Sequence, residues 1–268
     1  MKTLNRIIQA LLKSIPAGLI LLPIVITGLW SLSARWAWPD LIPSRFSLYG
    51  WKAFAVSNDA KLLPYSILLS LLVTVLTLAI SVPAAKALTY PFPGKSLVEV
   101  LVFLPIIVPT AAIAMGVHVN FLRLNLAYTM GGVVLMQIFP CLPYGIRIMH
   151  SVYEVLGDGW EKQGRILGAT RWQTFMRVTL PLLTPGLLAS FSMIFIVSFS
   201  QYFLTVLIGG GVIETFTTRM FPYLYSGNRT LASVYTGVFN LVSITVLVIV
   251  NRLTHKLYAE RFKEFYYV

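Results

Sequence analysis

The chain has 268 residues, of which 57% are hydrophobic and only 11% are charged, and its formal net charge is +12. About a quarter of the residues in a soluble domain are charged, so this composition excludes an ordinary water-soluble fold and indicates that lipid surrounds most of the chain. The basic residues lie at the ends of apolar segments, which is typical of membrane topology, and no nucleic-acid partner is expected.

Six apolar stretches are long enough to cross a bilayer as helices, which needs about 20 mostly apolar residues. Helices are expected because a backbone that faces lipid must satisfy its own hydrogen bonds. In chain order the predicted spans are residues 15–34, 62–85, 97–117, 131–149, 182–208 and 231–250. The sequence therefore predicts an all-α integral membrane protein that forms one domain over residues 1–268.

The distribution of Lys and Arg orients these spans. With the N-terminus in the cytoplasm, fourteen of the 21 basic residues lie on the inside and seven on the outside. Cytoplasmic loops carry an excess of Lys and Arg, so both termini are predicted to be cytoplasmic. The longest inside loop then joins the fourth and fifth spans, over about residues 151–181.

Proline residues interrupt the third and fourth predicted spans. Each proline removes a backbone hydrogen bond and kinks its helix. Kinked helices serve either as plain structure or as the lining of a pathway that alternates between two states. The sequence leaves both roles open for Pro105, Pro109, Pro140 and Pro143.

The inside loop between the fourth and fifth spans has a helical pattern on both sides of Gly168. Gly168 suits a reversal of the backbone, and Thr170 is a weak candidate for the N-cap of the helix that follows. Large side chains then recur on one face of that helix: Trp172, Phe175 and Met176. The pattern predicts two short amphipathic helices, which either rest on lipid headgroups or present a knob to a soluble partner.

This loop resembles the coupling loop of the permease subunits of binding-protein-dependent ATP-binding-cassette importers. In that family a Glu-Ala-Ala head is followed, after three residues, by Gly and then, after nine more, by Ile-x-Leu-Pro. Here Gly168 is followed after nine residues by Val178-Thr179-Leu180-Pro181. The head differs, because Lys162-Gln163-Gly164 stands where Glu-Ala-Ala is expected and Glu161 lies one position early.

The resemblance covers most of the chain and is strongest to the branch that handles polyamines, ferric iron, thiamine and phosphonates. It implies a type I permease fold of six spans, with the coupling loop between the fourth and fifth, and a loop that engages a separate ATPase. The residues to which it assigns this coupling are Glu161, Lys162, Gln163, Gly164, Leu167, Gly168, Ala169, Trp172, Phe175, Leu180 and Pro181.

The resemblance also implies the partners. These are a second permease subunit, identical or different, two cytoplasmic ATP-binding subunits, and a periplasmic or lipid-anchored solute-binding protein, all at a bacterial inner membrane that the chain crosses several times. No cofactor is expected in this chain, since ATP and magnesium belong to the ATPase. Gly94-Lys95-Ser96 is not a phosphate-binding loop, because Thr89 stands where its first Gly is required.

Polar residues inside the predicted spans are costly and therefore informative. They either bond neighbouring helices to each other or line the translocation pathway. The candidates for the pathway are Gln137, Tyr144, Ser198, Gln201, Tyr202 and Asn240.

Two other functions compete with the importer. An ion-coupled secondary transporter ordinarily needs carboxylates or histidines inside the membrane, and only Glu99 qualifies. An intramembrane enzyme needs a cluster of catalytic groups, whereas His118, His150 and His255 fall at the ends of three different spans. The chain is therefore predicted to be a non-catalytic subunit.

Overall fold

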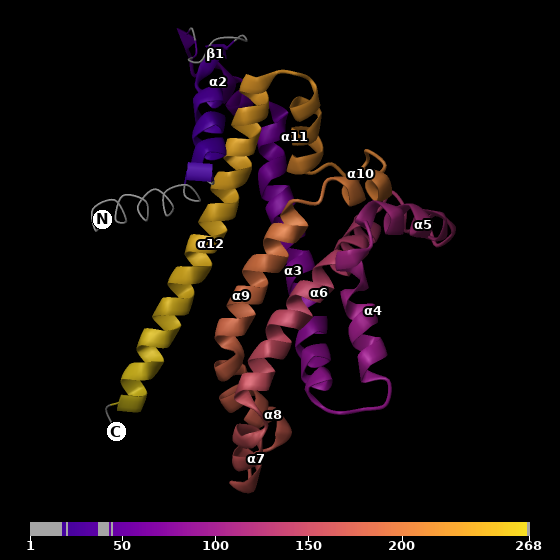
Figure 1. Cartoon of the computed structure of the whole chain (residues 1–268), viewed down its shortest axis with the longest axis vertical. Helices are drawn as coiled ribbons and strands as arrows, with labels where there is room; N and C mark the ends of the chain where they lie inside the picture. Colours follow the sequence, from indigo (N-terminus) through magenta and orange to yellow (C-terminus); the bar gives the residue numbers. More distant parts are fainter. Residues whose placement is uncertain (1–17, 20, 37–42, 44, 267–268) are drawn as a thin grey trace, which may run out of the picture. The chain divides into compact units, whose positions relative to one another are not determined.

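The computed structural model describes residues 18–19, 21–36, 43 and 45–266 (Figure 1). The chain divides into two compact units, residues 1–61 with 219–242 and residues 62–218 with 243–268. Each unit is described by itself, within the described ranges.

The first unit begins with an apolar helix over Leu21–Ser31. A short antiparallel pair of strands, β1 (Ser33–Arg35) and β2 (Arg45–Phe46), follows this helix. The hydroxyls of Ser31 and Ser33 donate to the carbonyls of Gly28 and Trp30, which satisfies backbone groups that the helix end leaves free. The prediction of a helix through residue 34 is therefore wrong at its end, and its first residues lie outside the described part of the chain.

The rest of the first unit packs around Tyr235. It contains α2 (Tyr49–Val56), η1 (Asn58–Lys61), most of α11 (Phe216–Tyr225) and the first part of α12 (Arg229–Tyr266). The Tyr235 ring contacts the rings of Phe54 and Tyr223, at centroid distances of 5.0 and 4.6 Å. Its hydroxyl donates to Asp59, a carboxylate that also lies 3.7 Å from Arg219 Nε.

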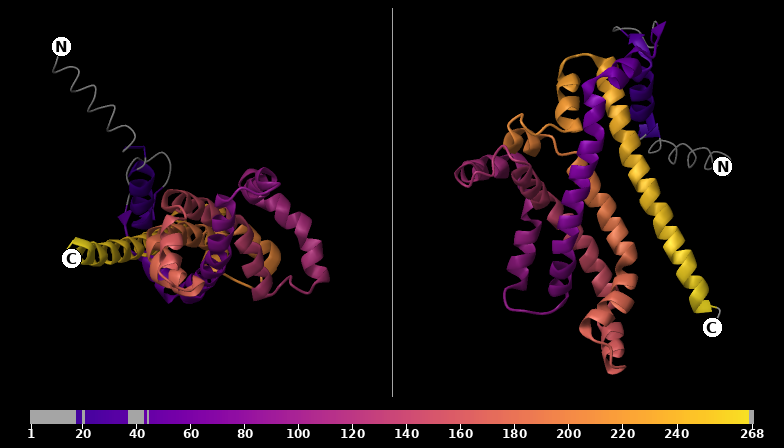
Figure 2. Two further views of the ribbon diagram at one scale, coloured as in Figure 1. Left: turned by 90° about the horizontal axis from the view of Figure 1, so that it is seen from below. Right: turned by 180° about the vertical axis from the view of Figure 1, so that it is seen from behind.

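The second unit holds the long helices and the loop hairpin. Its elements are α3 (Leu62–Thr89), α4 (Lys95–Ile107), α5 (Thr110–Arg123), α6 (Met130–Leu156), α7 (Gly159–Ile166), α8 (Arg171–Thr174), η2 (Phe175–Thr179), α9 (Leu180–Phe199) and α10 (Phe203–Gly209). The core lies where α3, α6 and α9 run side by side (Figure 2).

Small side chains allow these three helices to approach closely. The buried side of α3 carries a row of short polar groups, beside apolar residues such as Leu69 and Val73: Ser66, Ser70, Thr74, Thr77 and Ser81. Gly145 of α6 lies opposite Ser81, and its backbone also approaches Ile194 of α9. Such small residues are typical of helix pairs in membranes, where packing rather than the hydrophobic effect drives association.

The number of spans differs from the prediction. Within the described residues, four helices are long and apolar enough to cross a membrane: Asn58–Thr89, Met130–Leu156, Arg171–Phe199 and Arg229–Thr254. A fifth span results if the bent pair α4 and α5 is one crossing. Leu21–Ser31, the described part of the first predicted span, is too short to qualify by itself.

The third and fifth predicted spans are broken rather than continuous. Between α4 and α5 the helix axis turns by 103° (Figure 1). Val108 is extended (φ −81°, ψ 130°) ahead of Pro109, since a residue before proline avoids the helical region and proline has no N–H to continue the ladder. A second break, at residues 200–202, separates α9 from α10.

The close approach at Gly145 gives the first prediction. A Cβ in Gly145→Ala would lie 2.4 Å from Ser81 Oγ and 3.0 Å from Ile194 Cδ1. We expect the free energy of unfolding in detergent to fall by about 1–3 kcal/mol, because overpacking forces the helices apart. Gly116→Ala is the matched control, since nothing lies within 4 Å of its Cβ. Equal stability of the two variants would contradict this packing.

Candidate functional site

The loop between α6 and α9 folds as a hairpin of short helices, and we call α7, α8 and η2 with their connections the loop hairpin. Gly168 makes its bend with φ +86°, a left-handed conformation that favours glycine. The N–H groups of Gly168 and Ala169 donate to the carbonyls of Arg165 and Gly164 at 3.0 and 3.1 Å. These hydrogen bonds satisfy the last carbonyls of α7. The backbone reversal predicted at Gly168 is confirmed, and it results from the left-handed conformation of that glycine.

A capping box starts the second arm of the loop hairpin. Thr170 Oγ1 accepts from the Gln173 N–H at 3.2 Å, and Gln173 Oε1 accepts from the Thr170 N–H at 2.9 Å. Two backbone groups that would otherwise lack partners are thus satisfied reciprocally. Thr170 is the predicted N-cap, and its bond to Gln173 makes the cap stronger than the sequence indicated.

A π-helical turn, η2, joins α8 to the long helix α9. Pro181 follows in the first turn of α9 and cannot donate a backbone hydrogen bond. Single π-helical turns are rare and recur at functional sites. The second arm therefore continues into α9, a helix long and apolar enough to cross a membrane, without an intervening loop.

Apolar side chains on the loop hairpin face outward. Leu167 is 87% exposed and Trp172 is 67% exposed, and Trp160 and Ile166 are also exposed. Phe175 is half-buried and lies beside Trp172, at a centroid distance of 6.1 Å. An exposed apolar cluster of this kind, rimmed by charge, is typical of a docking surface.

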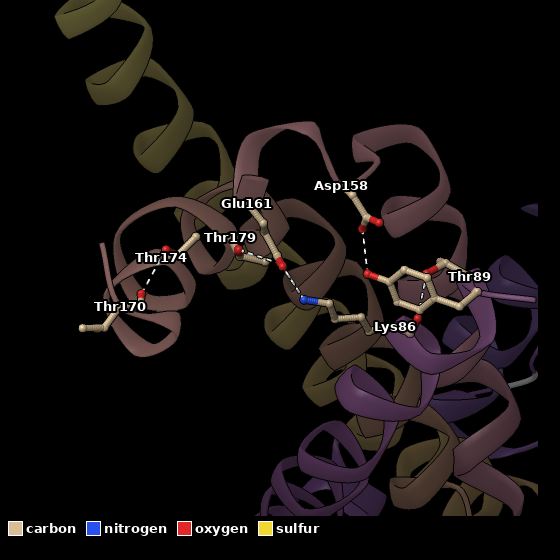
Figure 3. A network of polar contacts seen from close by, with 8 residues as sticks. Lys86, Thr89, Asp158, Glu161, Thr170, Thr174 and Thr179 are labelled. Atoms are coloured by element: carbon tan, nitrogen blue, oxygen red, sulfur yellow. Dashed lines mark hydrogen bonds and ion pairs between the residues drawn. The ribbon is translucent and has the colours of Figure 1, made fainter. Parts of the chain in front are cut away.

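The Glu161 carboxylate accepts hydrogen bonds from two other side chains of this chain, Lys86 and Thr179 (Figure 3). Lys86 Nζ, at the end of α3, lies 2.7 and 2.6 Å from the two Glu161 carboxylate oxygens. The Thr179 hydroxyl donates to the same carboxylate at 2.9 Å. The resemblance assigns Glu161 to the ATPase interface, but here its carboxylate joins α3, α7 and η2 to one another.

A second polar contact ties the same two parts of the unit together. The Tyr90 hydroxyl donates to Asp158 Oδ1 at 2.7 Å. This hydrogen bond, with a smaller effect of burial, raises the pKa of Tyr90 to about 12. The phenol therefore stays protonated and keeps donating at any physiological pH.

Sequence reasoning missed four members of these contacts: Lys86, Tyr90, Asp158 and Thr179. By sequence alone, Lys86 counts only as one of the fourteen basic residues predicted on the inside. A lysine at the end of a predicted span, followed by acidic residues in a later inside loop, weakly indicates an ion pair between the lysine and one of these carboxylates. Nothing in the sequence says which carboxylate it would meet.

The two helix breaks of the second unit meet at a cavity of about 260 Å³. Its lining consists of Pro105, Ile106, Ile107, Val108, Pro109, Thr110, Pro140, Tyr144, Val197 and Gln201. Of the six pathway candidates, it brings Tyr144 and Gln201 together. Broken helices that line a cavity are the usual form of a solute site in membrane transporters.

Gln137 and Ser198, two other candidates, lie in the core. Gln137 Nε2 donates to Thr205 Oγ1 at 2.9 Å, and the Ser198 hydroxyl donates to Gln137 Oε1 at 2.7 Å. All three side chains are buried. Gln137 thus ties α6 to α9 and α10 on both sides of the break. Tyr202 lies at that break and Asn240 in the α12 segment of the first unit, and both are half-buried.

Comparisons with known proteins agree on the family. Residues 77–257 match the model of the family described as "Binding-protein-dependent transport system inner membrane component". The sulfate transport system permease protein CysT of Escherichia coli is 30% identical over 179 residues, which cover 61% of this chain and 65% of that protein. A probable sulfate permease of Prototheca wickerhamii is 28% identical, with 60% of this chain and 69% of that protein covered.

A solved structure shares the fold. A bacterial ABC transporter involved in the import of the acidic polysaccharide alginate superposes with a TM-score of 0.66 at 20% identity, covering 93% of this chain and 95% of that chain. A second structure of the alginate transporter, in complex with a periplasmic protein that holds an alginate pentasaccharide, gives a TM-score of 0.65 at 13% identity, covering 92% and 93%. The sequence relatives are named for sulfate, which corrects the expected branch of polyamine, iron, thiamine and phosphonate permeases.

The contact between Lys86 and Glu161 gives the second prediction. In a double-mutant cycle of Lys86→Met and Glu161→Gln, we expect a coupling of about 1–2 kcal/mol in the free energy of unfolding, because both side chains are partly shielded from water. Lys95 and Glu99, 3.7 Å apart within one helix, form the control pair, for which about 0.5 kcal/mol is expected. Additive effects at Lys86 and Glu161 would contradict a joining role.

Proposed function

Because the chain belongs to the family of inner membrane components of binding-protein-dependent transport systems, we propose that it is the non-catalytic membrane subunit of an ATP-driven importer. It crosses the inner membrane several times. We propose that residues 1–268 form one transmembrane domain, that this domain provides half of the translocation pathway, and that a second membrane subunit, identical or different, provides the other half.

The loop hairpin is proposed to dock on a separate cytoplasmic ATPase, which binds ATP and magnesium. The observation that carries this proposal is the exposed apolar cluster of Trp160, Ile166, Leu167 and Trp172 on short, capped helices. An amphipathic helix that presents such side chains fits a groove on a soluble partner. Contact of this cluster with lipid headgroups explains the structure less well, since the cluster includes residues of both arms of the loop hairpin.

Glu161 is proposed to pass the ATPase movement to the pathway. Its carboxylate holds Lys86 on α3 and Thr179 ahead of α9. A push on α7 would therefore move both helices together, and these two helices pack against α6, whose Tyr144 lines the cavity. Such coupling acts in both directions, so that solute delivery also affects the ATPase.

The proposed solute is sulfate or a similar small oxyanion. The relatives named for sulfate support this, and so does the cavity, because none of its lining residues is a carboxylate. A polyamine or ferric ion would require negative partners there. The cavity instead offers the hydroxyls of Thr110 and Tyr144, the Gln201 amide and the first turn of α5, and the amino end of a helix favours an anion.

A periplasmic or lipid-anchored binding protein is proposed to deliver the oxyanion. The alginate transporter, which shares this fold, was solved with a periplasmic protein bound. The proposed outer loops of this chain carry more basic than acidic residues, which suits both an anionic solute and an acidic docking face.

Two alternatives remain for the test. An ion-coupled secondary transporter would need a free carboxylate in the membrane, but Glu99 lies 3.7 Å from Lys95. An intramembrane enzyme would leave the exposed hairpin cluster without a role. Both alternatives predict uptake or turnover without any ATPase chain.

Uptake of radiolabelled sulfate gives the third prediction. Cells that produce this chain with its partner subunits should accumulate sulfate in a vanadate-sensitive manner, since a vanadate-trapped ATPase cannot drive the cycle. Spermidine, a cation, serves as the control solute and should not be accumulated. Sulfate uptake that persists after the ATPase chain is deleted would overturn the importer proposal.

The exposed hairpin cluster gives the fourth prediction. Leu167→Asp should weaken the complex with the ATPase at least about tenfold, because burying a carboxylate at an apolar contact costs more than about 1.4 kcal/mol. The measurement is co-purification of the ATPase with the tagged chain. Leu124→Asp is the matched control, since Leu124 is 66% exposed and lies after α5, outside the loop hairpin. Equal losses in both variants would argue against hairpin docking.

A further inference from the structure

A second cavity lies between the end of α3 and the loop hairpin. Its volume is about 330 Å³, and its lining comprises Lys86, Tyr90, Glu161, Arg165, Arg171, Thr174 and Phe175. It is separate from the cavity at the helix breaks, with which it shares no lining residue. All of its walls belong to the second unit.

The charges around this cavity do not balance. Three cations, Lys86, Arg165 and Arg171, face one carboxylate, Glu161. That carboxylate already accepts from Lys86 and Thr179. The Tyr90 and Thr174 hydroxyls are also used, since they donate to Asp158 and to the Thr170 carbonyl. Among the residues that the structure describes, neither Arg165 nor Arg171 has an ion pair.

We propose that Arg165 and Arg171 bind a tetrahedral oxyanion of the phosphate or sulfate type in this cavity. Each guanidinium presents a planar fork of N–H donors that matches two oxygens of such an anion. Lys86 is paired with Glu161, so the two guanidinium groups carry the net positive charge of the cavity wall. This site lies on the loop hairpin, away from the cavity proposed for the imported solute, and its existence does not depend on that proposal.

The two arginines lie on either side of the bend, so an anion bound to both would join the two arms of the loop hairpin. Arg165 is on α7 and Arg171 is on α8, with Gly168 between them. Two like charges that face one cavity repel each other. A bound oxyanion replaces this repulsion with bonds to both arms, and so makes the loop hairpin more rigid. Occupancy of the site thereby sets how firmly the hairpin transmits movement.

The walls favour a small anion or a lipid headgroup over a protein carboxylate. Lys86 and Tyr90 come from the end of α3, where a spanning helix leaves the membrane. The proposed ATPase contact is instead made by Leu167 and Trp172, whose side chains are not part of the cavity lining. A phosphate from a phospholipid headgroup and free sulfate or phosphate share the chemistry that the two arginines recognise.

Modification of arginine by phenylglyoxal tests the site at single residues. The full-length chain, in nanodiscs of phosphatidylcholine alone, is treated with the reagent in sodium sulfate or in sodium chloride of equal ionic strength. Mass spectrometry of peptides gives the rate of modification of each arginine. With sulfate at twice its dissociation constant, the rates at Arg165 and Arg171 should fall about threefold, since only empty sites react.

Arg177 is the internal control, because it is exposed on the same hairpin and lies outside the cavity lining. Its rate should not change. Equal protection of all three arginines, or of none, would overturn the proposal. Arg165→Gln should also remove the protection of Arg171, which tests whether the two act on one anion.

Two further experiments distinguish the source of the anion. Phosphatidylcholine balances its phosphate with a choline cation, whereas phosphatidylglycerol does not. Protection in nanodiscs that contain phosphatidylglycerol, without sulfate, would therefore identify the phosphate of an anionic headgroup. Protection by sulfate alone would identify a free anion. Either result supports the oxyanion site. If the complete transporter protects both arginines with no anion added and in phosphatidylcholine alone, an ATPase carboxylate occupies them, and the proposal fails. None of these experiments measures transport, so their result is independent of the test of the importer.

Discussion

The carboxylate of Glu161 holds the loop hairpin in place. It accepts hydrogen bonds from the Lys86 ammonium on α3 and from the Thr179 hydroxyl in η2. An ion pair at this depth is favourable because both groups keep some contact with water while the hydroxyl satisfies a further lone pair. Without it, α7 would be held by the Tyr90–Asp158 hydrogen bond and by its contacts with the second arm. The direction of the hairpin, and hence the exposure of its apolar cluster, depends on this contact.

The second unit combines closely packed helices with two breaks in its helices. α3, α6 and α9 pack closely because serine, threonine and glycine line their contacts. The breaks at Val108-Pro109 and at residues 200–202 expose backbone groups, which lipid could not satisfy. Protein side chains take over that role at the second break, where Thr205 donates to the Gln201 carbonyl and Gln137 holds Thr205. The result is a cavity whose shape is fixed by the surrounding helices.

The mechanical role that we propose rests on how these parts are connected. The loop hairpin continues through η2 into α9 without an intervening loop, and Glu161 joins it to α3. Both helices contact α6, which carries Tyr144 at the cavity wall. In the proposed mechanism, a movement of the hairpin reaches the cavity through two short, packed routes, one by α3 and one by α9. An anion between Arg165 and Arg171 would tighten the first step of both routes.

The sequence by itself determined which segments are apolar and where the hairpin bends. These properties depend on local composition: long apolar runs need lipid, and the left-handed bend at Gly168 favours glycine. The family could be inferred in the same way, from the spacing between Gly168 and Pro181. The tertiary structure decided the rest, because it depends on partners far apart in the chain. Whether a proline stays within a helix, as Pro140 does, or lies at the end of one, as Pro109 does, depends on the helices packed around it. Glu161 is an internal contact rather than a free carboxylate because α3 places Lys86 beside it, 75 positions away, and no local pattern encodes that meeting.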